Sequence, residues 1–567
     1  MDEDLNEDAN EDVNEDANED VNGALNEDLN GALNGDRGTE REAAPGRTSA
    51  PDLEGLLYVV RPAPEMTIKA PTTRNAFRKR LKANVGDAVK RWGLRASVRA
   101  LYGRLMVHID PGDERPDAVA ARAAEALSHV FGVASFSPAE GHCRADLDTV
   151  AAVGRELFAE RVKGRRYAVR CKRTGSHAFG SMDVERELGA ALNEGATVDL
   201  TDPEVTVSVE ITGGRAVFFS ERLPGPGGLP LGTGGRALVL LSGGYDSVVA
   251  AWYVMKRGVD VDFLHCRMGG SASERLTLQI AKVLTDRWAM GSRPDFYAVD
   301  FAPVVEELQV SSQPTYWQVV LKRQMLRTGD ALADRIERDL DRRSKQRGER
   351  RKPQMVDALV TGEALAQVSS QTLSNLRAID GAAGRPVLRP LAGFDKLEII
   401  RGAERIGTAA LSAQVREFCA ITPGHPVTST RPGEVERQEA GLDPARLTSL
   451  VERAERRPLR ALTPADLVLP YLYVDELPDG VVVLDCRAEG RPGRWQPEGA
   501  VDAPLPGLLS RLREFDKAPT YVLFCQFGTR SAQAAEVMQQ AGFEAYSFRG
   551  GEPALRAHLG RAGRVSA

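Results

Sequence analysis

The chain has 567 residues, and its formal net charge is −6 at pH 7. A chain of this length holds three or four domains, each with its own core. It contains no run of 18 apolar residues, which excludes a membrane-spanning helix, and its acidic start is the opposite of a signal peptide. We therefore expect a cytoplasmic protein without a membrane partner. Six cysteines exclude a disulfide scaffold, so a linked pair in a reducing compartment is expected to be catalytic.

The charge is distributed unevenly along the chain. The first 42 residues hold 16 acidic and two basic residues, a net charge of −14, so the remaining residues carry +8. Residues 1–50 repeat Asn-Glu-Asp with a period of four and have too few apolar side chains to form a core. We expect a disordered acidic tail there, because Asn and Asp are also poor helix formers. The mildly basic remainder suits a polyanionic partner.

Residues 51–117 are predicted to begin the folded part as a ferredoxin-like domain. A βαββαβ-like order is typical of this module. The basic helix of this unit is interpreted as either a solvated face or an RNA site. The strands and helices that we expect lie at 56–60, 72–92, 105–109, 117–127 and 133–137.

Residues 118–222 contain a basic loop at the end of a predicted strand, with Lys172, Arg173 and His177. His177 alone would be interpreted as a surface histidine. Together with Asp183-Val-Glu-Arg186, however, the stretch resembles a THUMP domain, an RNA-binding module that grips the tRNA acceptor end. The resemblance makes the three basic residues candidates for RNA binding. The elements expected here are 150–160, 166–172, 184–193, 205–211 and 215–220.

Residues 223–430 are organised around the sequence Ser-Gly-Gly-Tyr-Asp-Ser at 242–247. An apolar strand precedes it and a helical pattern follows it, so Gly243 and Gly244 let backbone N–H groups approach an anion at a helix N-terminus. The Walker pattern is absent, and the acidic Asp246 among phosphates implies a bridging Mg²⁺. The motif resembles the PP-loop of ATP pyrophosphatases, which adenylate a carbonyl oxygen. A serine-glycine turn in another α/β domain is the alternative.

Strands predicted at 260–266, 295–299 and 358–361 alternate with helices. This alternation indicates a doubly wound sheet that binds ligands at the carboxyl ends of its strands. Lys322 and Lys396 are candidate counter-charges for ATP phosphates, although most helix lysines only face solvent. We expect the basic stretch 337–352 to lengthen a loop as a solvated insertion, with contact to tRNA as the alternative.

A flexible, charged linker is expected at 431–462, before a last domain at 463–559 and a short tail at 560–567. In that domain a strand at 521–524 leads directly into Cys525-Gln-Phe-Gly-Thr-Arg530-Ser531 and a helix. A cysteine in such a nest of N–H groups is suited to act as a thiolate or persulfide. With Asp485-x-Arg487 upstream, the loop resembles a rhodanese domain. A buried structural cysteine is one alternative, and a Cys-x₅-Arg phosphatase, whose spacing is one residue longer, is another.

The modules together predict an α/β multidomain protein, and from about 56 to 559 the chain resembles the bacterial tRNA 4-thiouridine synthases (tRNA sulfurtransferases). Neither the acidic tail nor the basic stretch 337–352 has a counterpart that we can place in that family. The shared strings are Pro64-Glu65-x-Thr67-Ile68-Lys69, Asp183-Val-Glu-Arg186, 242–247, 361–373, Arg389-Pro390-Leu391 and Glu417-x-Cys419.

The resemblance implies a reaction in which MgATP activates O4 of uridine 8 of tRNA as an adenylate. A cysteine desulfurase loads sulfur on Cys525 as a persulfide, and the persulfide or sulfide released from it attacks C4 and displaces AMP. Cys419 then forms a disulfide with Cys525, which a cellular reductant opens. In the family the same sulfur carrier also feeds thiazole synthesis for thiamine.

The resemblance also implies residue roles. Asp246 would be the acid of the PP-loop, and Lys396 a catalytic lysine. A sulfur carrier for thiazole synthesis, in which only Cys525 matters, and a non-enzymatic RNA-binding protein are the alternatives, and a homodimer is left open. The nucleotide contacts would be Leu240, Leu241, Ser242, Gly243, Gly244, Ser247, Lys322, Gly362 and Gln371.

Overall fold

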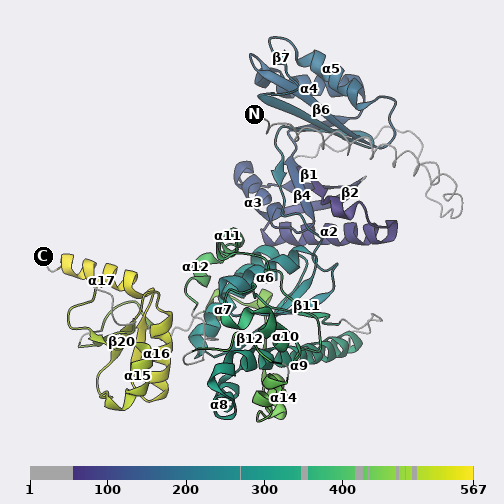
Figure 1. Cartoon of the computed structure of the whole chain (residues 1–567). Coiled ribbons are helices and arrows are strands. Elements are labelled where there is room, and N and C mark those ends of the chain that lie inside the picture. The colour runs from purple at the N-terminus through teal and green to yellow at the C-terminus, as the bar shows by residue number, and fades with distance from the viewer. Residues whose placement is uncertain are drawn as a thin grey trace, which may run out of the picture. The chain divides into compact units, whose positions relative to one another are not determined.

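The computed structural model describes residues 55–101, 103–268, 270–346, 355–415, 425–431, 433–467, 472–478, 480–487 and 495–565. The predicted acidic tail and Cys419 lie outside these residues. Within the described part, the strands form four sheets, each combined with helices (Figure 1). None of the helices described is both long enough and apolar enough to cross a membrane.

The first sheet has the strand order β10-β4-β1-β3-β2, and all its pairs are antiparallel. The order along the chain is βαββαβ, as predicted, and α2 and α3 contribute Leu81, Val85 and Ala123 to its core. The predicted domain boundary at 117/118 is wrong, because the sheet needs β4 to pair with β1. The elements are β1 (Leu56–Pro62), α2 (Pro71–Arg91), β2 (Arg95–Leu101), β3 (Arg104–Asp110), α3 (Pro116–Ser128), β4 (Val133–Pro138) and β10 (Leu223–Pro224).

The second sheet has the order β5-β9-β8-β6-β7, and α4 and α5 pack on it. Its central pair, β6 and β8, is parallel from Tyr167 to Thr174, which extends the strand predicted to end at residue 172. The elements are β5 (Gly141–Arg144), α4 (Leu147–Val162), β6 (Arg166–Thr174), α5 (Ser181–Leu192), β7 (Thr197–Val198), β8 (Val205–Thr212) and β9 (Arg215–Phe219).

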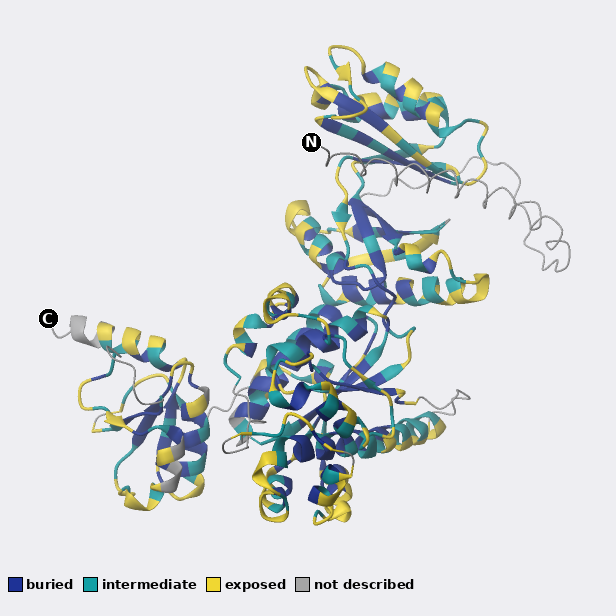
Figure 2. Ribbon diagram, viewed as in Figure 1, coloured by how far each residue is buried: buried dark blue, intermediate teal, exposed yellow. Residues whose placement is uncertain are grey.

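The third sheet has the order β15-β14-β11-β12-β13-β16 and is parallel apart from its last strand. Val239 and Leu238 of β11 enter separate cores on its two faces, which confirms the doubly wound fold. The strands of this sheet are mostly buried between helices (Figure 2). The elements are β11 (Arg236–Leu240), α6 (Tyr245–Lys256), β12 (Asp260–Arg267), α7 (Gly270–Trp288), β13 (Asp295–Asp300), α8 (Ala302–Ser311), α9 (Trp317–Gln346), β14 (Ala358–Val360), α10 (Leu373–Asp380), β15 (Val387–Leu388), α11 (Lys396–Ile406), α12 (Ala409–Ser412), α13 (Glu434–Glu439), α14 (Pro444–Arg453) and β16 (Glu455–Pro458).

Two predictions for this region are wrong. The segment 431–462 is no flexible linker, because β16 pairs with β13 and Leu459 is fully buried in a core of the third sheet. The segment contains a short amphipathic helix, α14, whose Leu447 and Leu450 are buried, and its many charged residues made this helix hard to predict. In the stretch 337–352, the residues up to Gln346 continue α9, and only those before 347 are described.

The fourth sheet is entirely parallel, with the order β17-β21-β20-β18-β19. Its last helix runs to Val565, so the predicted end of the domain at 559 is too early. The elements are β17 (Tyr473–Val474), β18 (Val482–Asp485), β19 (Val501–Asp502), α15 (Leu505–Ser510), β20 (Tyr521–Phe524), α16 (Thr529–Gln540), β21 (Ala545–Phe548) and α17 (Gly551–Val565).

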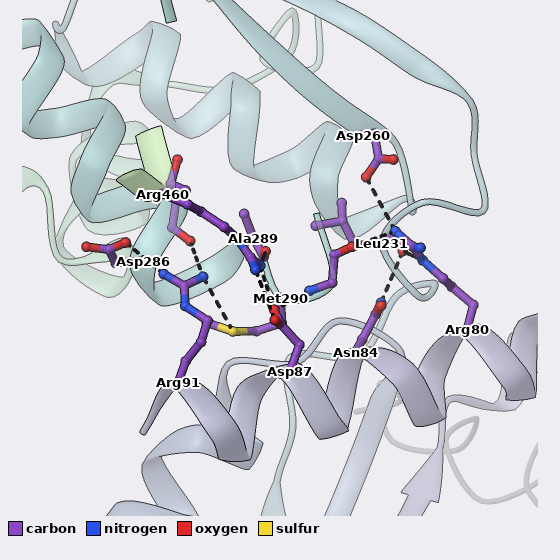
Figure 3. A network of polar contacts seen from close by, with 12 residues as sticks. Arg80, Asn84, Asp87, Arg91, Leu231, Asp260, Asp286, Ala289, Met290 and Arg460 are labelled. Atoms are coloured by element: carbon purple, nitrogen blue, oxygen red, sulfur yellow. Dashed lines mark hydrogen bonds and ion pairs between the residues drawn. The ribbon is translucent and has the colours of Figure 1, made fainter. Parts of the chain in front are cut away.

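A polar network joins α2 of the ferredoxin-like domain to the domain built on the third sheet (Figure 3). Asp87 accepts hydrogen bonds from both terminal nitrogens of Arg460, at 2.9 and 2.5 Å, and from the N–H of Gly291 at 2.7 Å. Arg80 donates to the carbonyl of Leu231, and Arg91 lies 2.7 Å from Asp286. Some basic residues of this helix therefore hold two domains together.

Candidate functional site

The predicted phosphate-binding loop lies between β11 and α6, at the carboxyl edge of the parallel strands. Gly243 has a φ of +83°, which favours glycine, and a Cβ there would lie 2.8 Å from Oγ1 of Thr277. The Ser247 hydroxyl oxygen accepts the N–H of Ser242 at 3.2 Å, which closes the loop. Because α6 begins directly after the loop, the free N–H groups there favour an anion.

Gly362 brings the end of a second strand against this loop. It follows β14 closely, and a Cβ on it would lie 2.4 Å from the backbone nitrogen of Ser247. Backbone atoms cannot yield as a flexible side chain can, so only glycine allows this approach. The contact explains why glycine follows the strand at this position.

A cavity of about 490 Å³ opens at the loop, and residues from β11, β12, α9 and the segment after β14 line it. Most of the residues predicted to contact the nucleotide therefore line one cavity. Gly243 is not among the lining residues and shapes the loop instead. The predicted residues that line the cavity are Leu240, Leu241, Ser242, Gly244, Asp246, Ser247, Lys322, Gly362, Gln371 and Lys396.

The two residues predicted to be catalytic here meet in this cavity. Lys396, the first residue of α11, places its ammonium nitrogen 2.7 Å from Oδ1 of Asp246. The other carboxylate oxygen of Asp246 accepts a hydrogen bond from Nε2 of Gln367 at 3.1 Å. Asp395 and Glu398 form a capping box that fixes the start of α11, and with it the position of Lys396.

Lys322 is held by a buried carboxylate that the sequence did not single out. Its ammonium nitrogen lies 2.6 Å from Oε1 of Glu363, and Nε of Arg389 lies 2.8 Å from Oε2. Arg389 continues the chain of charges to Asp380, at 2.6 Å. Burial raises the pKa of Glu363, but the charges of Lys322 and Arg389 outweigh it and hold that pKa below its ordinary value.

His265 is a second lining residue that the sequence analysis missed. Its Nδ1 donates a hydrogen bond to the carbonyl of Leu241 at 3.0 Å, while its Nε2 is buried and has no hydrogen-bond partner among the described residues. Burial lowers its pKa, so the ring is neutral and offers a lone pair at Nε2. Its place at the carboxyl end of β12 was the signal that could have found it.

The cysteine loop of the fourth sheet has the predicted position at the end of β20. Cys525 is 3% exposed, and the Ser531 hydroxyl lies 3.5 Å from its sulfur. Gly528, with a φ of +87°, caps α16, whose N-terminus faces the loop. A Cβ on Gly551 would lie 2.4 Å from the carbonyl oxygen of Cys525, so the loop closes tightly against the start of α17.

Arg487 of the predicted Asp485-x-Arg487 motif stabilises this loop through a chain of contacts. Its guanidinium contacts Asp485 at 2.6 Å and Glu552 at 2.5 Å. The N–H of Glu552 in turn donates to the carbonyl of Cys525 at 2.8 Å. Arg530 is exposed beside the loop. The motif therefore acts on the backbone that shapes the cysteine loop.

The three predicted RNA-binding residues lie at the end of β6 and just after it. The ring of His177 donates from Nε2 to the carbonyl of Gly213 at 2.5 Å and accepts from Arg173 at Nδ1, 3.1 Å away. Lys172 is exposed on the same strand, where it neighbours Arg173 and therefore points to the opposite face of the sheet. The structure thus brings Arg173 and His177 together but not Lys172, and whether any of the three binds RNA stays a prediction.

Family models match four parts of the chain. They are the ThiI ferredoxin-like domain over 58–137, the THUMP domain over 144–221, the thiamine biosynthesis protein (ThiI) over 232–340 and 347–443, and the rhodanese-like domain over 472–558. The tRNA sulfurtransferase of Pyrobaculum aerophilum is 38% identical over 434 residues, which cover 75% of this chain and 84% of that protein. The chain belongs to the tRNA sulfurtransferase family.

Other members of the tRNA sulfurtransferase family match over nearly their whole length. The enzyme of Proteus mirabilis is 33% identical over 497 residues, which cover 86% of this chain and 98% of that protein. A 4-thiouridine synthetase, solved as a complex with RNA and bound ATP, is 27% identical with a TM-score of 0.57 and covers 71% of this chain and 99% of that chain. The ferredoxin-like, THUMP and rhodanese predictions are confirmed.

Proposed function

We propose that the protein is an ATP-dependent tRNA uridine 4-sulfurtransferase that acts on uridine 8. The observation that carries the proposal is the presence, in one chain, of a PP-loop cavity and a cysteine loop of rhodanese type. Curated relatives of more than 30% identity carry the name tRNA sulfurtransferase, which supports the same activity. The tRNA substrate also favours a cytoplasmic location.

In the first half-reaction, the cavity binds ATP with its phosphates at the loop 242–247. The N–H groups at the start of α6 and the ammonium groups of Lys322 and Lys396 stabilise the charge that develops when pyrophosphate leaves. The uridine O4 attacks the α-phosphate and becomes an adenylate, which converts a poor leaving group into a good one. Leu240, Leu241, Gly362 and Gln371 are proposed to contact the nucleotide, because they line the same cavity.

Mg²⁺ is proposed to act with ATP, where it would neutralise charge on the phosphates. The described residues contain no group of three or more His, Cys, Asp or Glu side chains that could hold a metal alone. Mg²⁺ is commonly bound by one or two carboxylates together with substrate phosphates, so the single carboxylate of Asp246 fits this mode. Its two oxygens, now held by Lys396 and Gln367, supply the protein's oxygen ligand.

In the second half-reaction, Cys525 carries the sulfur. The terminal sulfur of its persulfide attacks C4 of the activated uridine, and AMP leaves. The thiolate of Cys419 then attacks the sulfur of Cys525, which releases 4-thiouridine and leaves a Cys419–Cys525 disulfide. A cysteine desulfurase that supplies the persulfide and a reductant that opens the disulfide complete the cycle. The N–H groups at the start of α16 support a sulfur anion at Cys525.

A second function, sulfur supply for the thiazole of thiamine, is favoured by the description of the matching family model as a thiamine biosynthesis protein. Asp246→Ala separates the two functions. It removes the acid of the adenylation site and leaves the cysteine loop intact, so tRNA thiolation is lost while thiamine supply survives. If tRNA thiolation survives in this variant, the proposed adenylation at this cavity is wrong.

A further inference from the structure

Two buried hydroxyl groups form a chain behind the sulfur of Cys525. Ser531 lies in the first turn of α16, and Ser547 lies on β21, outside the cysteine loop. Both residues are fully buried. The two hydroxyl oxygens lie 2.8 Å apart, and that of Ser531 lies 3.5 Å from the sulfur. Each hydroxyl oxygen also lies 3.1 Å from the carbonyl oxygen of Gly528.

The number of protons limits how these contacts can be satisfied. The carbonyl of Gly528 already accepts the N–H of Ala532 at 3.0 Å, so it has one further lone pair to offer. The short contact between the two hydroxyls requires one of their two protons. When Ser531 donates to Ser547, Ser547 donates to Gly528 and the sulfur receives nothing. When Ser547 donates to Ser531, the proton of Ser531 is free to bond either the carbonyl of Gly528 at 3.1 Å or the sulfur at 3.5 Å.

We propose that Ser547 is a positioning residue for the sulfur carrier: its hydroxyl donates to Ser531, which then donates to the sulfur of Cys525 whenever that sulfur is anionic. The assignment rests on the proposed function for the role of Cys525, and on the measured distances for the chain of hydroxyls. A hydrogen bond to a charged acceptor is stronger than one between neutral groups, so a thiolate or persulfide anion selects this arrangement. When Cys525 is a neutral thiol, the other arrangement is favoured, in which Ser531 donates to Ser547 and Ser547 donates to the carbonyl of Gly528.

The surroundings of the sulfur make this donor important. Cys525 belongs to a buried cluster with Cys486, Leu523 and Ala534, which offers little solvent to stabilise an anion. Burial, together with negative charge at Cys525, raises the pKa of Cys486 well above its ordinary value, so Cys486 remains a neutral thiol. In such a site a single well-aimed hydroxyl has a large effect on a sulfur anion.

The test is the rate at which iodoacetamide alkylates Cys525 in the full-length protein at pH 6.5, followed by peptide mass spectrometry. Ser531→Ala is expected to slow the reaction about ten-fold and Ser547→Ala about three-fold, because the sulfur loses all or part of a charge-assisted hydrogen bond. The double variant is expected to match Ser531→Ala, because Ser547 acts through Ser531. Ala545→Gly, which removes one buried carbon from the same strand, is the matched control and should leave the rate within two-fold.

A purely structural role for Ser547 predicts the opposite sign. A loosened domain would expose both cysteines. In the Ser547→Ala variant, iodoacetamide would then alkylate Cys525 faster and would also alkylate Cys486. That result, an unchanged rate, or a double variant slower than Ser531→Ala alone would each overturn the proposal. If the Cys525→Ser variant still thiolates tRNA, the proposed function is wrong. The alkylation rates would still decide whether Ser547 positions the hydrogen bond that Ser531 donates to the sulfur of Cys525.

Discussion

Lys396 and Asp246 form an ion pair of 2.7 Å in the nucleotide cavity although 150 residues separate them in the chain. Asp246 lies in the first turn of α6 and Lys396 begins α11, so each charge is fixed by a helix start. The cation can bind a phosphate of ATP, and the acid beside it can hold a metal ion. The pair is the centre of the proposed adenylation site.

Lys396→Ala is therefore expected to reduce tRNA-dependent pyrophosphate release about 100-fold, because a positioned cation contributes a few kcal/mol to a developing phosphate charge. Lys345→Ala, which removes an exposed lysine of α9, is the control and should retain full activity. Equal activity of the Lys396 variant and the wild type would show that Lys396 has no role in the reaction.

Gly362→Ala tests the contact between the two nucleotide motifs. Its Cβ would lie 2.4 Å from the backbone nitrogen of Ser247, so the loop must move and the KM for ATP is expected to rise about ten-fold or more. Gly393→Ala is a matched control, because a Cβ at that position meets nothing within 4 Å. If both variants bind ATP equally well, the cavity does not require the close approach of these strands.

Glu363→Gln replaces a buried carboxylate, which pairs with two cations, by a neutral amide. Lys322 and Arg389 would keep their charges without a counter-ion, so we expect a loss of about 3 kcal/mol in the free energy of unfolding. Urea unfolding measures this loss. Glu404→Gln, at an exposed position of α11, is the control and should change stability by less than about 0.5 kcal/mol.

The same carboxylate predicts a pH dependence. The pKa of Glu363 in the folded protein lies below its ordinary value of 4.5, so its stabilising contribution is present above that value and is lost as the pH falls through the lower, folded-state pKa. The difference in stability between wild type and Glu363→Gln is therefore expected to be largest near pH 7 and to shrink below pH 4.5. A difference that stays constant down to pH 3 would contradict the ionised pair.

Asp87 and Arg460 are predicted to be coupled across two domains (Figure 3). Asp87→Ala and Arg460→Ala should each lower Tm by about 2–4 °C, and the double variant should lower it little further, because the same contact is lost each time. The exposed pair Arg511 and Glu514 is the control, for which coupling should be negligible. Additive shifts for Asp87 and Arg460 would show that the two domains are not held by this pair.

The sequence allowed each module to be predicted where a motif and a periodic pattern agreed. The strand, glycine loop and helix around Asp246 and the strand before Cys525 have strong local signals, and both lie where they were expected. The segment 431–462 was misjudged because its charged residues hide contacts with distant strands. β16 pairs with β13 across more than 150 residues, and a charged composition carries no signal of such a partner.

The site residues whose roles the sequence did not reveal also depend on contacts between distant parts of the chain. Glu363, Arg389 and Asp380 acquire their roles from one another, through contacts that no local spacing reveals. Ser547 lies on a strand beyond the cysteine loop and is brought to Ser531 only by the pairing of β21 with β20. Composition and motifs predict which chemistry is present, whereas the supporting charges and hydroxyls follow from tertiary contacts.

The measurement that tests the central claim most directly is nucleoside analysis of tRNA incubated with the protein, MgATP, cysteine and a cysteine desulfurase. Wild type is expected to form 4-thiouridine at position 8, with no product when ATP is omitted or when Cys525→Ser replaces wild type. Cys419→Ser is expected to give at most one turnover, because the sulfur bond is no longer resolved. Wild-type protein that carries a persulfide on Cys525 and yet forms no 4-thiouridine would contradict the account.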